Sequence, residues 1–184
     1  MKTIEQNKKY KLDELPIDAS RFKLKALRVW EGREGGGFEC NLFIDGVCIA
    51  RAYNSADGGE TTIDYLSVER EEIAKEIEES LKDYPWLIFS PDADDFAPWD
   101  IEAIINVLID LENERKWIKK ETLKFILYRT PKTEEGGWTG QKRKFKVSHK
   151  WCAREEEDIF KLIQKQCPDV TEIVGFRTRK DWKA

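Results

Sequence analysis

The strongest constraint on how this chain folds lies between residues 38 and 53, where two apolar–polar alternations flank the dipeptide Asp45-Gly46. Asp-Gly between alternating runs favours a two-residue β-turn, because both central positions of that turn need a positive φ. The register that this turn sets pairs apolar residues across the two strands: Ile44 with Val47, Leu42 with Ile49, and Phe38 with Tyr53. The segment therefore predicts a β-hairpin with one buried face.

Further strand patterns lie on both sides of this hairpin. Residues 22–29 alternate with a phase slip after Ala26, which predicts a strand with a bulge, and the glycine-rich run 32–37 predicts a flexible connection. Residues 61–66 predict another strand after the turn at 57–60. Ser67 suits a helix N-cap, and apolar residues then recur every four positions, at Ile73, Ile77 and Leu81, until Pro85. The N-terminal lobe is thus expected to be an antiparallel β-meander covered by one acidic helix.

The second half of the chain predicts a lobe with the order α-β-β-α-β. Residues 90–98 form a loop rich in helix breakers, and Pro98 suits the first position of a helix that runs to about Trp117. Its broad apolar face includes Ile101, Ile104, Ile105, Leu108, Ile109 and Leu111. Strands are expected around 123–127, 145–151 and 170–178, with a helix before Cys167-Pro168. The fold class is α+β, with a polar arm (1–20), a meander with its acidic helix (21–90) and the second lobe (91–184), as separate domains or one continuous domain.

Composition narrows the class of protein. The chain has 184 residues, of which 40% are hydrophobic and seven are Trp, and this content indicates a globular chain. No apolar run approaches the roughly 20 residues that span a bilayer, and the polar N-terminus lacks a signal-peptide pattern. Four cysteines occur without a C-x-x-C pair, so reduced thiols are expected. These features predict a cytoplasmic protein with no membrane contact.

The net charge of -4 conceals a segregation along the chain. Residues 57–114 hold 18 acidic side chains against 3 basic ones, a net of -15, whereas residues 115–151 hold 12 basic against 3 acidic, a net of +9. Such blocks are typical of solvated faces, although they can also dock parts of a chain or attract charged partners.

No complete catalytic motif is present. The glycine run lies between strands instead of opening a helix, so it lacks the geometry that cradles phosphate. Asp92, Asp94 and Asp95 lack calcium-loop spacing and fit an acidic loop that precedes a helix. His149 is the only histidine, and its alternation with apolar neighbours favours a structural role over catalysis with Cys152 or Ser148. The sequence predicts no enzyme, no cofactor and no metal site.

The binding candidates lie mainly on the basic strand at 142–151. Cations interleaved with aromatic residues can neutralise phosphate and stack bases, although a half-buried strand with a solvated face is the more economical interpretation. Arg33, in the glycine-rich loop, is a further candidate. The full set of ligand-binding or nucleic-acid-binding candidates is Trp138, Lys142, Arg143, Lys144, Lys146, Trp151 and Arg33. A separate alternative is that the acidic helix at 69–83 mimics nucleic-acid charge, with carboxylates at spacings of three and four.

The glycine-rich loop, the Asp-Gly hairpin and a second glycine turn together resemble a group of uncharacterised bacteriophage or prophage proteins. The shared features are the G-R-x-G-x-G-F loop at 32–38, the D-G turn at 45–46 and the G-G-E turn at 58–60, within a resemblance over about 22–66. The resemblance implies a small protein of the host bacterial cytosol, and it supplies no catalytic residue.

The first functional hypothesis is therefore a phage-type accessory protein that binds and modulates a host factor. A counter-defence role, as an inhibitor or as a sponge for a nucleotide signal, is one form of this hypothesis, and the partner is then a host protein or a nucleotide-type small molecule. Nucleic-acid binding by the basic strand and acidic mimicry are the alternatives. Homo-oligomers fit the same class of protein.

Overall fold

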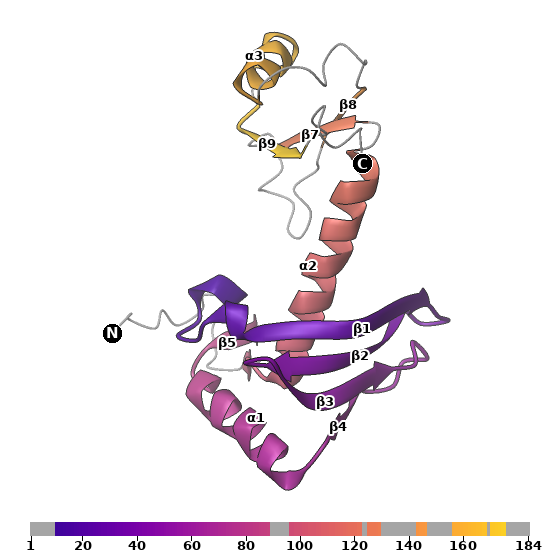
Figure 1. Cartoon of the computed structure of the whole chain (residues 1–184), viewed down its shortest axis with the longest axis vertical. Helices are drawn as coiled ribbons and strands as arrows, with labels where there is room; N and C mark the ends of the chain where they lie inside the picture. The colour runs from indigo at the N-terminus through magenta and orange to yellow at the C-terminus, as the bar shows by residue number, and fades with distance from the viewer. Residues whose placement is uncertain are drawn as a thin grey trace. The chain divides into compact units, whose positions relative to one another are not determined.

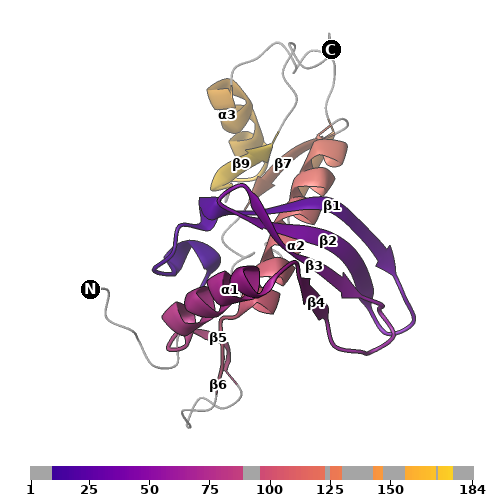
Figure 2. The same cartoon turned by 60° about the horizontal axis from the view of Figure 1, so that its bottom comes forward.

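The computed structural model describes residues 10–88, 96–122, 125–129, 143–146, 156–168 and 170–175, and it has the predicted α+β fold (Figures 1 and 2). The chain divides into two compact units, Met1–Leu111 and Glu112–Ala184. Within the described residues, no helix combines the length and the apolar character needed to span a membrane. Each unit is described by itself below.

A four-stranded antiparallel sheet forms the centre of the first unit (Figure 1). The strands β1 (Phe22–Glu31), β2 (Gly36–Ile44), β3 (Val47–Asn54) and β4 (Thr62–Tyr65) follow one another in space as in sequence. Two 3-10 turns, η1 (Leu12–Glu14) and η2 (Ala19–Arg21), precede β1. This arrangement confirms the predicted meander.

The Asp45-Gly46 turn forms as predicted, but the register beyond it is different. Both turn residues have positive φ values, 50° and 82°, and Ile44 pairs with Val47. The predicted pairs Leu42–Ile49 and Phe38–Tyr53 are wrong, since a bulge follows the first two pairs. Leu42 pairs with Ala50 and Phe38 with Asn54. Because Ile49 is an extra residue in β3, it and Ala50 are both buried.

The predicted bulge in β1 is confirmed. The pairing steps from Lys25 opposite Asn41 to Arg28 opposite Glu39, so β1 advances three residues while β2 advances two. Ala26 adopts a φ of 54° at this point and is exposed. The bulge therefore restores the alternation of faces after Ala26.

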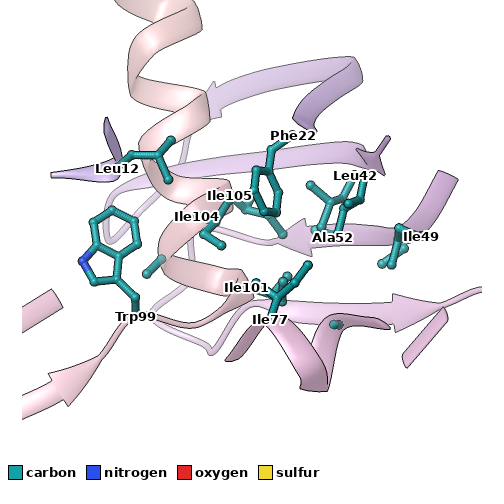
Figure 3. Close-up of a cluster of buried hydrophobic side chains, with 14 of the residues drawn as sticks. Leu12, Phe22, Leu42, Ile49, Ala52, Ile77, Trp99, Ile101, Ile104 and Ile105 are labelled. Atoms are coloured by element: carbon teal, nitrogen blue, oxygen red, sulfur yellow. The ribbon is translucent and has the colours of Figure 1, made fainter. Parts of the chain in front are cut away.

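Two helices, not one, cover the inner face of this sheet. α1 (Val68–Leu81) buries Ala74, Ile77 and Leu81, which belong to the predicted stripe or flank it. The N-terminal half of α2 (Ile101–Glu121) adds Ile101, Ile104 and Ile105 to the same cluster (Figure 3). The sheet contributes Phe22, Phe38, Cys40, Leu42, Ile44, Ile49, Ala50 and Ala52. The covering helix was predicted correctly, but the depth to which α2 enters this core was not.

Part of the predicted polar arm packs on this core. Tyr10, Leu12 and Leu15 are buried in the cluster, and the Tyr10 N–H donates a hydrogen bond to the carbonyl of Pro85. Residues 1–9 lie outside the described residues.

The start of α2 differs from the prediction. Pro98 is the last residue of β6 (Phe96–Pro98), which pairs with β5 (Pro85–Ile88). The helix begins at Ile101, and the Asp100 carboxylate caps it by accepting the N–H of Ala103 at 2.7 Å. It continues to Glu121, four residues past the expected end at Trp117.

The division between the units falls inside α2, later than the boundary that the sequence suggests near residue 90. The physical reason is that the first turns of α2 are buried against the sheet of the first unit, so they belong to its core. Leu111, assigned by the sequence to the apolar face, is instead 50% exposed.

The second unit contains a three-stranded antiparallel sheet of order β8-β7-β9. β7 (Phe125–Arg129) is its central strand, with β8 (Arg143–Lys146) and β9 (Glu172–Gly175) at the edges. The apolar side of α3 (Glu156–Gln166) packs on the sheet through Ile159 and Ile163, against Ile126, Tyr128 and Val170. With the C-terminal part of α2, these elements confirm the predicted α-β-β-α-β order, although only parts of the predicted strands 145–151 and 170–178 are described.

We expect Leu42→Ala to lower the free energy of unfolding by about 2–5 kcal/mol, because the Leu42 side chain is fully buried between the sheet and α2. Leu111→Ala is the matched control, and its effect should stay within about 0.5 kcal/mol, since half of that side chain is already in solvent. Chemical denaturation followed by circular dichroism measures both values. Equal losses in the two variants would contradict the core described above.

Candidate functional site

The face of the four-stranded sheet opposite to α1 and α2 carries no covering element within the described residues of the first unit. Strand pairing places a single set of side chains on it, all of which are exposed or half-buried apart from the buried glycine. We call this surface the outer face. Its members are Lys23, Lys25, Arg28 and Trp30 of β1, Gly37, Glu39, Asn41 and Phe43 of β2, Cys48, Arg51 and Tyr53 of β3, and Thr62 and Asp64 of β4.

Trp30 forms a fixed aromatic plate at one end of the outer face. Its indole lies over Gly37, its pairing partner, where an added Cβ would be 2.3 Å from Nε1. The Nε1–H donates to the carbonyl of Ser55 at 3.3 Å, and the ring of Tyr53 lies beside it with centroids 5.8 Å apart. Position 37 therefore requires glycine, because the indole occupies the space that a side chain would fill. Trp30 and Tyr53 together form an aromatic surface that extends from β1 across β2 to β3.

Phe43 is a second aromatic group on the outer face, near the opposite end of β2. The Nζ of Lys25 lies 4.0 Å from the centre of its ring. A cation–π contact of this kind at an exposed site contributes about 0.5–1 kcal/mol. The ring and the ammonium group are thus held together in the unbound protein by a weak interaction.

The outer face is locally positive in a chain of net negative charge. Four cations, Lys23, Lys25, Arg28 and Arg51, stand against two carboxylates, Glu39 and Asp64. Only Arg28 and Glu39 approach each other as an ion pair among these groups, at 3.8 Å with both side chains more than half exposed. A surface pair of this type contributes little, so the four cations are accessible to an anionic partner.

The glycine-rich loop and the second glycine turn pack together beside the Trp30 plate. The Glu34 N–H donates to the carbonyl of Ala56, and a Cβ on Gly32 would lie 2.3 Å from the Cβ of Ala56. The side chain of Glu34 also lies against Gly58, whose φ is 79°. The predicted connection at 32–37 is thus shorter than expected, since Gly36 and Gly37 belong to β2, and its remaining residues pack with the second glycine turn in one compact tip. Arg33, a predicted candidate, is exposed in this tip.

The other predicted candidates lie in the second unit. Arg143, Lys144 and Lys146 belong to β8, which pairs with β7 and is an edge strand of its sheet. Trp138, Lys142 and Trp151 lie outside the described residues, as do His149 and the acidic loop at 92–95. The structure thus gives a strand for part of the basic segment and leaves its proposed binding role as a prediction.

A shallow depression between α1 and the start of α2 does not have the chemistry of a nucleotide pocket. Two lysines and three acids line it, together with Pro98 and Trp99. Lys75 is paired with Glu71 at 2.6 Å and Lys82 with Glu79, so both lysines are already engaged on their own helix. The indole Nε1 of Trp99 has no hydrogen-bond partner within the described residues, and nothing there accounts for it.

The cysteines and acids of the described residues do not gather into a metal-binding group. Cys40 and Cys48 are free thiols, and burial raises the pKa of Cys40 to about 11, with a smaller contribution from Glu39. No group of three histidine, cysteine or carboxylate side chains within the described ranges could hold a metal ion. The acids at positions 69, 72, 76 and 79 of α1, and Asp83 just beyond its end, are all exposed, as expected for a solvated helix face.

Comparisons of the chain with protein-family models, with curated proteins and with solved structures found no match. The functional assignment therefore depends on the residues of the outer face. The sequence pattern contained a signal for one of them, since Phe43 alternates with the buried Leu42 and Ile44 and is aromatic where a polar residue is typical. Tyr53 carried no such signal, because only the bulge at Ile49 moves it to the outer face.

We expect Gly37→Ala to destabilise the protein by about 1–3 kcal/mol and to displace the Trp30 indole, because the new Cβ overlaps Nε1 and also lies 2.8 Å from the carbonyl oxygen of Asn54. Gly36→Ala is the matched control, since nothing lies within 4 Å of its added Cβ. Denaturation and the indole N–H resonance of Trp30 measure the two effects. A Gly37→Ala protein that is as stable as Gly36→Ala and has an unshifted indole resonance would contradict the packing of the Trp30 indole on Gly37.

We expect Cys40 to resist iodoacetamide in the folded protein at pH 8. A thiol of pKa about 11 is ionised in roughly one molecule in a thousand at that pH, and the side chain is 1% exposed. Peptide mapping by mass spectrometry compares Cys40 with the half-buried Cys48 before and after addition of urea. Rapid native labelling of Cys40 would show that the inner face opens readily.

Proposed function

We propose that this chain binds single-stranded nucleic acid on the outer face of the first unit, without catalysing a reaction. The observation that carries the proposal is the combination of three aromatic side chains with an excess of cations on one open sheet face. Aromatic rings stack on bases, and Lys or Arg side chains neutralise the phosphates between them. The proposal gives the nucleic-acid alternative from the sequence a different location.

The free energies of the two contacts favour replacement of the Lys25 ammonium group by a nucleic-acid base over the ring of Phe43. Stacking of a base on an aromatic side chain contributes about 1–3 kcal/mol, whereas the Lys25–Phe43 contact contributes about 0.5–1 kcal/mol. When a base replaces Lys25 over the Phe43 ring, the ammonium group remains close enough to contact the adjoining phosphate. The cation–π contact in the unbound protein thus keeps Lys25 beside Phe43, where both can contact the nucleic acid.

The shape of the site favours a single strand over a duplex. In a duplex the faces of the bases are stacked on one another, and only their edges are accessible in the grooves. Stacking on Phe43, Tyr53 and Trp30 requires free base faces, which a single strand offers at no unpairing cost. The sheet is also nearly fixed before binding, because the buried inner face and the compact tip hold it.

The setting remains the one that the phage resemblance implies, which is action in a bacterial cytosol. A single-stranded nucleic acid is a component that phage and host both contain there, so this proposal and the host-factor hypothesis are compatible. The basic edge strand β8 is a second cationic segment of the same chain.

The test is fluorescence anisotropy with a labelled 15-nucleotide oligo-dT and a hairpin duplex, at 50 mM and 200 mM salt. We expect the single strand to bind more tightly than the duplex, with affinity that falls as salt rises because bound phosphates release counterions. Phe43→Thr, which replaces the ring with a β-branched residue that suits a strand, should weaken binding at least about fivefold through loss of stacking. Lys25→Met should weaken it and reduce the salt dependence.

Lys82→Met at the C-cap of α1 is the control, since it removes the same charge from the other side of the sheet. It should leave the affinity for oligo-dT unchanged. Absence of binding at 50 mM salt would overturn the proposed function. If oligo-dT binds but neither Phe43→Thr nor Lys25→Met weakens the binding, the binding site does not lie on the outer face. The basic segment 142–151 is then the next candidate.

A further inference from the structure

We infer that the middle of the outer face recognises a purine, flanked on each side by a base stacked on an aromatic side chain. This inference rests on the proposed function and adds a base preference to it. The residues concerned are Asn41 of β2 and Arg51 of β3, which are pairing partners across the sheet.

The spacing of the strands sets the footprint. Asn41 is two residues from Phe43 along β2, and Arg51 is two residues from Tyr53 along β3, so each lies one side-chain level from an aromatic residue. Successive levels on one face are about 6.7 Å apart. That is about twice the 3.4 Å per base of a stacked strand. An extended single strand therefore places one base at Phe43, the next at Asn41 and Arg51, and the third at Tyr53 and Trp30.

The chemistry of the middle level differs from that of its neighbours. Within the outer face, this level offers no aromatic ring, but it offers the amide of Asn41 and the exposed guanidinium of Arg51. Either group can donate a hydrogen bond to N7, a single acceptor that adenine and guanine share and that pyrimidines lack. A base held at this level between two stacked neighbours thus presents its edge to two N–H donors. A purine accepts a hydrogen bond from one of them at N7, whereas a pyrimidine offers no N7 and leaves that contact unmade.

The charges near this level are compatible with that preference. Asp64 is the partner of Arg51 on β4, and Lys25 is the partner of Asn41 on β1. Lys25 faces the phosphate side of the proposed strand, as argued above for Phe43. The carboxylate of Asp64 can accept a hydrogen bond from N6 of adenine, which lies beside N7, and Arg51 can donate to O6 of guanine at the same position, so this level offers a partner to either purine.

The experiment compares oligo-dT with oligonucleotides in which every third base is adenine, guanine or cytosine, all measured by anisotropy at 50 mM salt. We expect both purine series to bind about fivefold or more tighter than oligo-dT, and the cytosine series to bind like oligo-dT. Asn41→Ala and Arg51→Lys should abolish most of the purine advantage. Because Arg51→Lys preserves the charge, any fall in its affinity for oligo-dT should be smaller than the fall in its affinity for the purine series.

Thr62→Ala is the matched control for Asn41→Ala, because Thr62 lies on the same face at the β4 edge and outside the middle level. It should retain the full purine advantage. Equal affinity for all four sequences would overturn this inference while leaving the proposed function intact. Loss of the preference in Thr62→Ala to the same extent as in Asn41→Ala would also overturn it. Failure of every oligonucleotide to bind would instead refute the proposed function itself.

Discussion

The burial of one face of a four-stranded sheet is the interaction on which the rest of the first unit depends. Leu42, fully buried from β2, packs into the same cluster as Ile101, Ile104 and Ile105 of α2 and Ile77 of α1 (Figure 3). Each such side chain contributes about 1.5–3 kcal/mol when it leaves water. Because both helices pack on this inner face, no helix among the described residues of the first unit covers the opposite face of the sheet. The position of the outer face is therefore determined by which face of the sheet the core buries.

Two bulges keep these faces distinct over long strands. Without the extra residue near Ala26, the second half of β1 would have the opposite orientation, and Trp30 would point toward the core. Without the extra residue at Ile49, Arg51 and Tyr53 would leave the outer face. Each bulge thus corrects the phase of one strand, and together they gather the aromatic and cationic side chains on a single surface. The positive φ of Ala26 is the local cost of that correction.

Local patterns predicted the elements well because they report local physics. The Asp45-Gly46 turn, the bulge in β1 and the stripe of α1 all depend on residues close together in sequence, and all three are present. The register beyond the turn could not be predicted, because the bulge at Ile49 places two consecutive side chains in a core that distant helices complete. The same holds for α2. Its first turns join the meander only because the sheet offers them an apolar surface.

The outer face escaped prediction for a related reason. Charge was the feature that drew attention in the sequence, and it pointed to the segment with the highest density of lysine and arginine. On the sheet, the cations come from two separate stretches of chain, Lys23 to Arg28 and Arg51, and neither of these has the charge density of the basic segment. Pairing in register is what brings them beside Phe43 and Tyr53. A surface assembled across strands has no signature in linear composition. The question to ask of a meander is therefore which side chains its strand pairing places on the face that no helix covers.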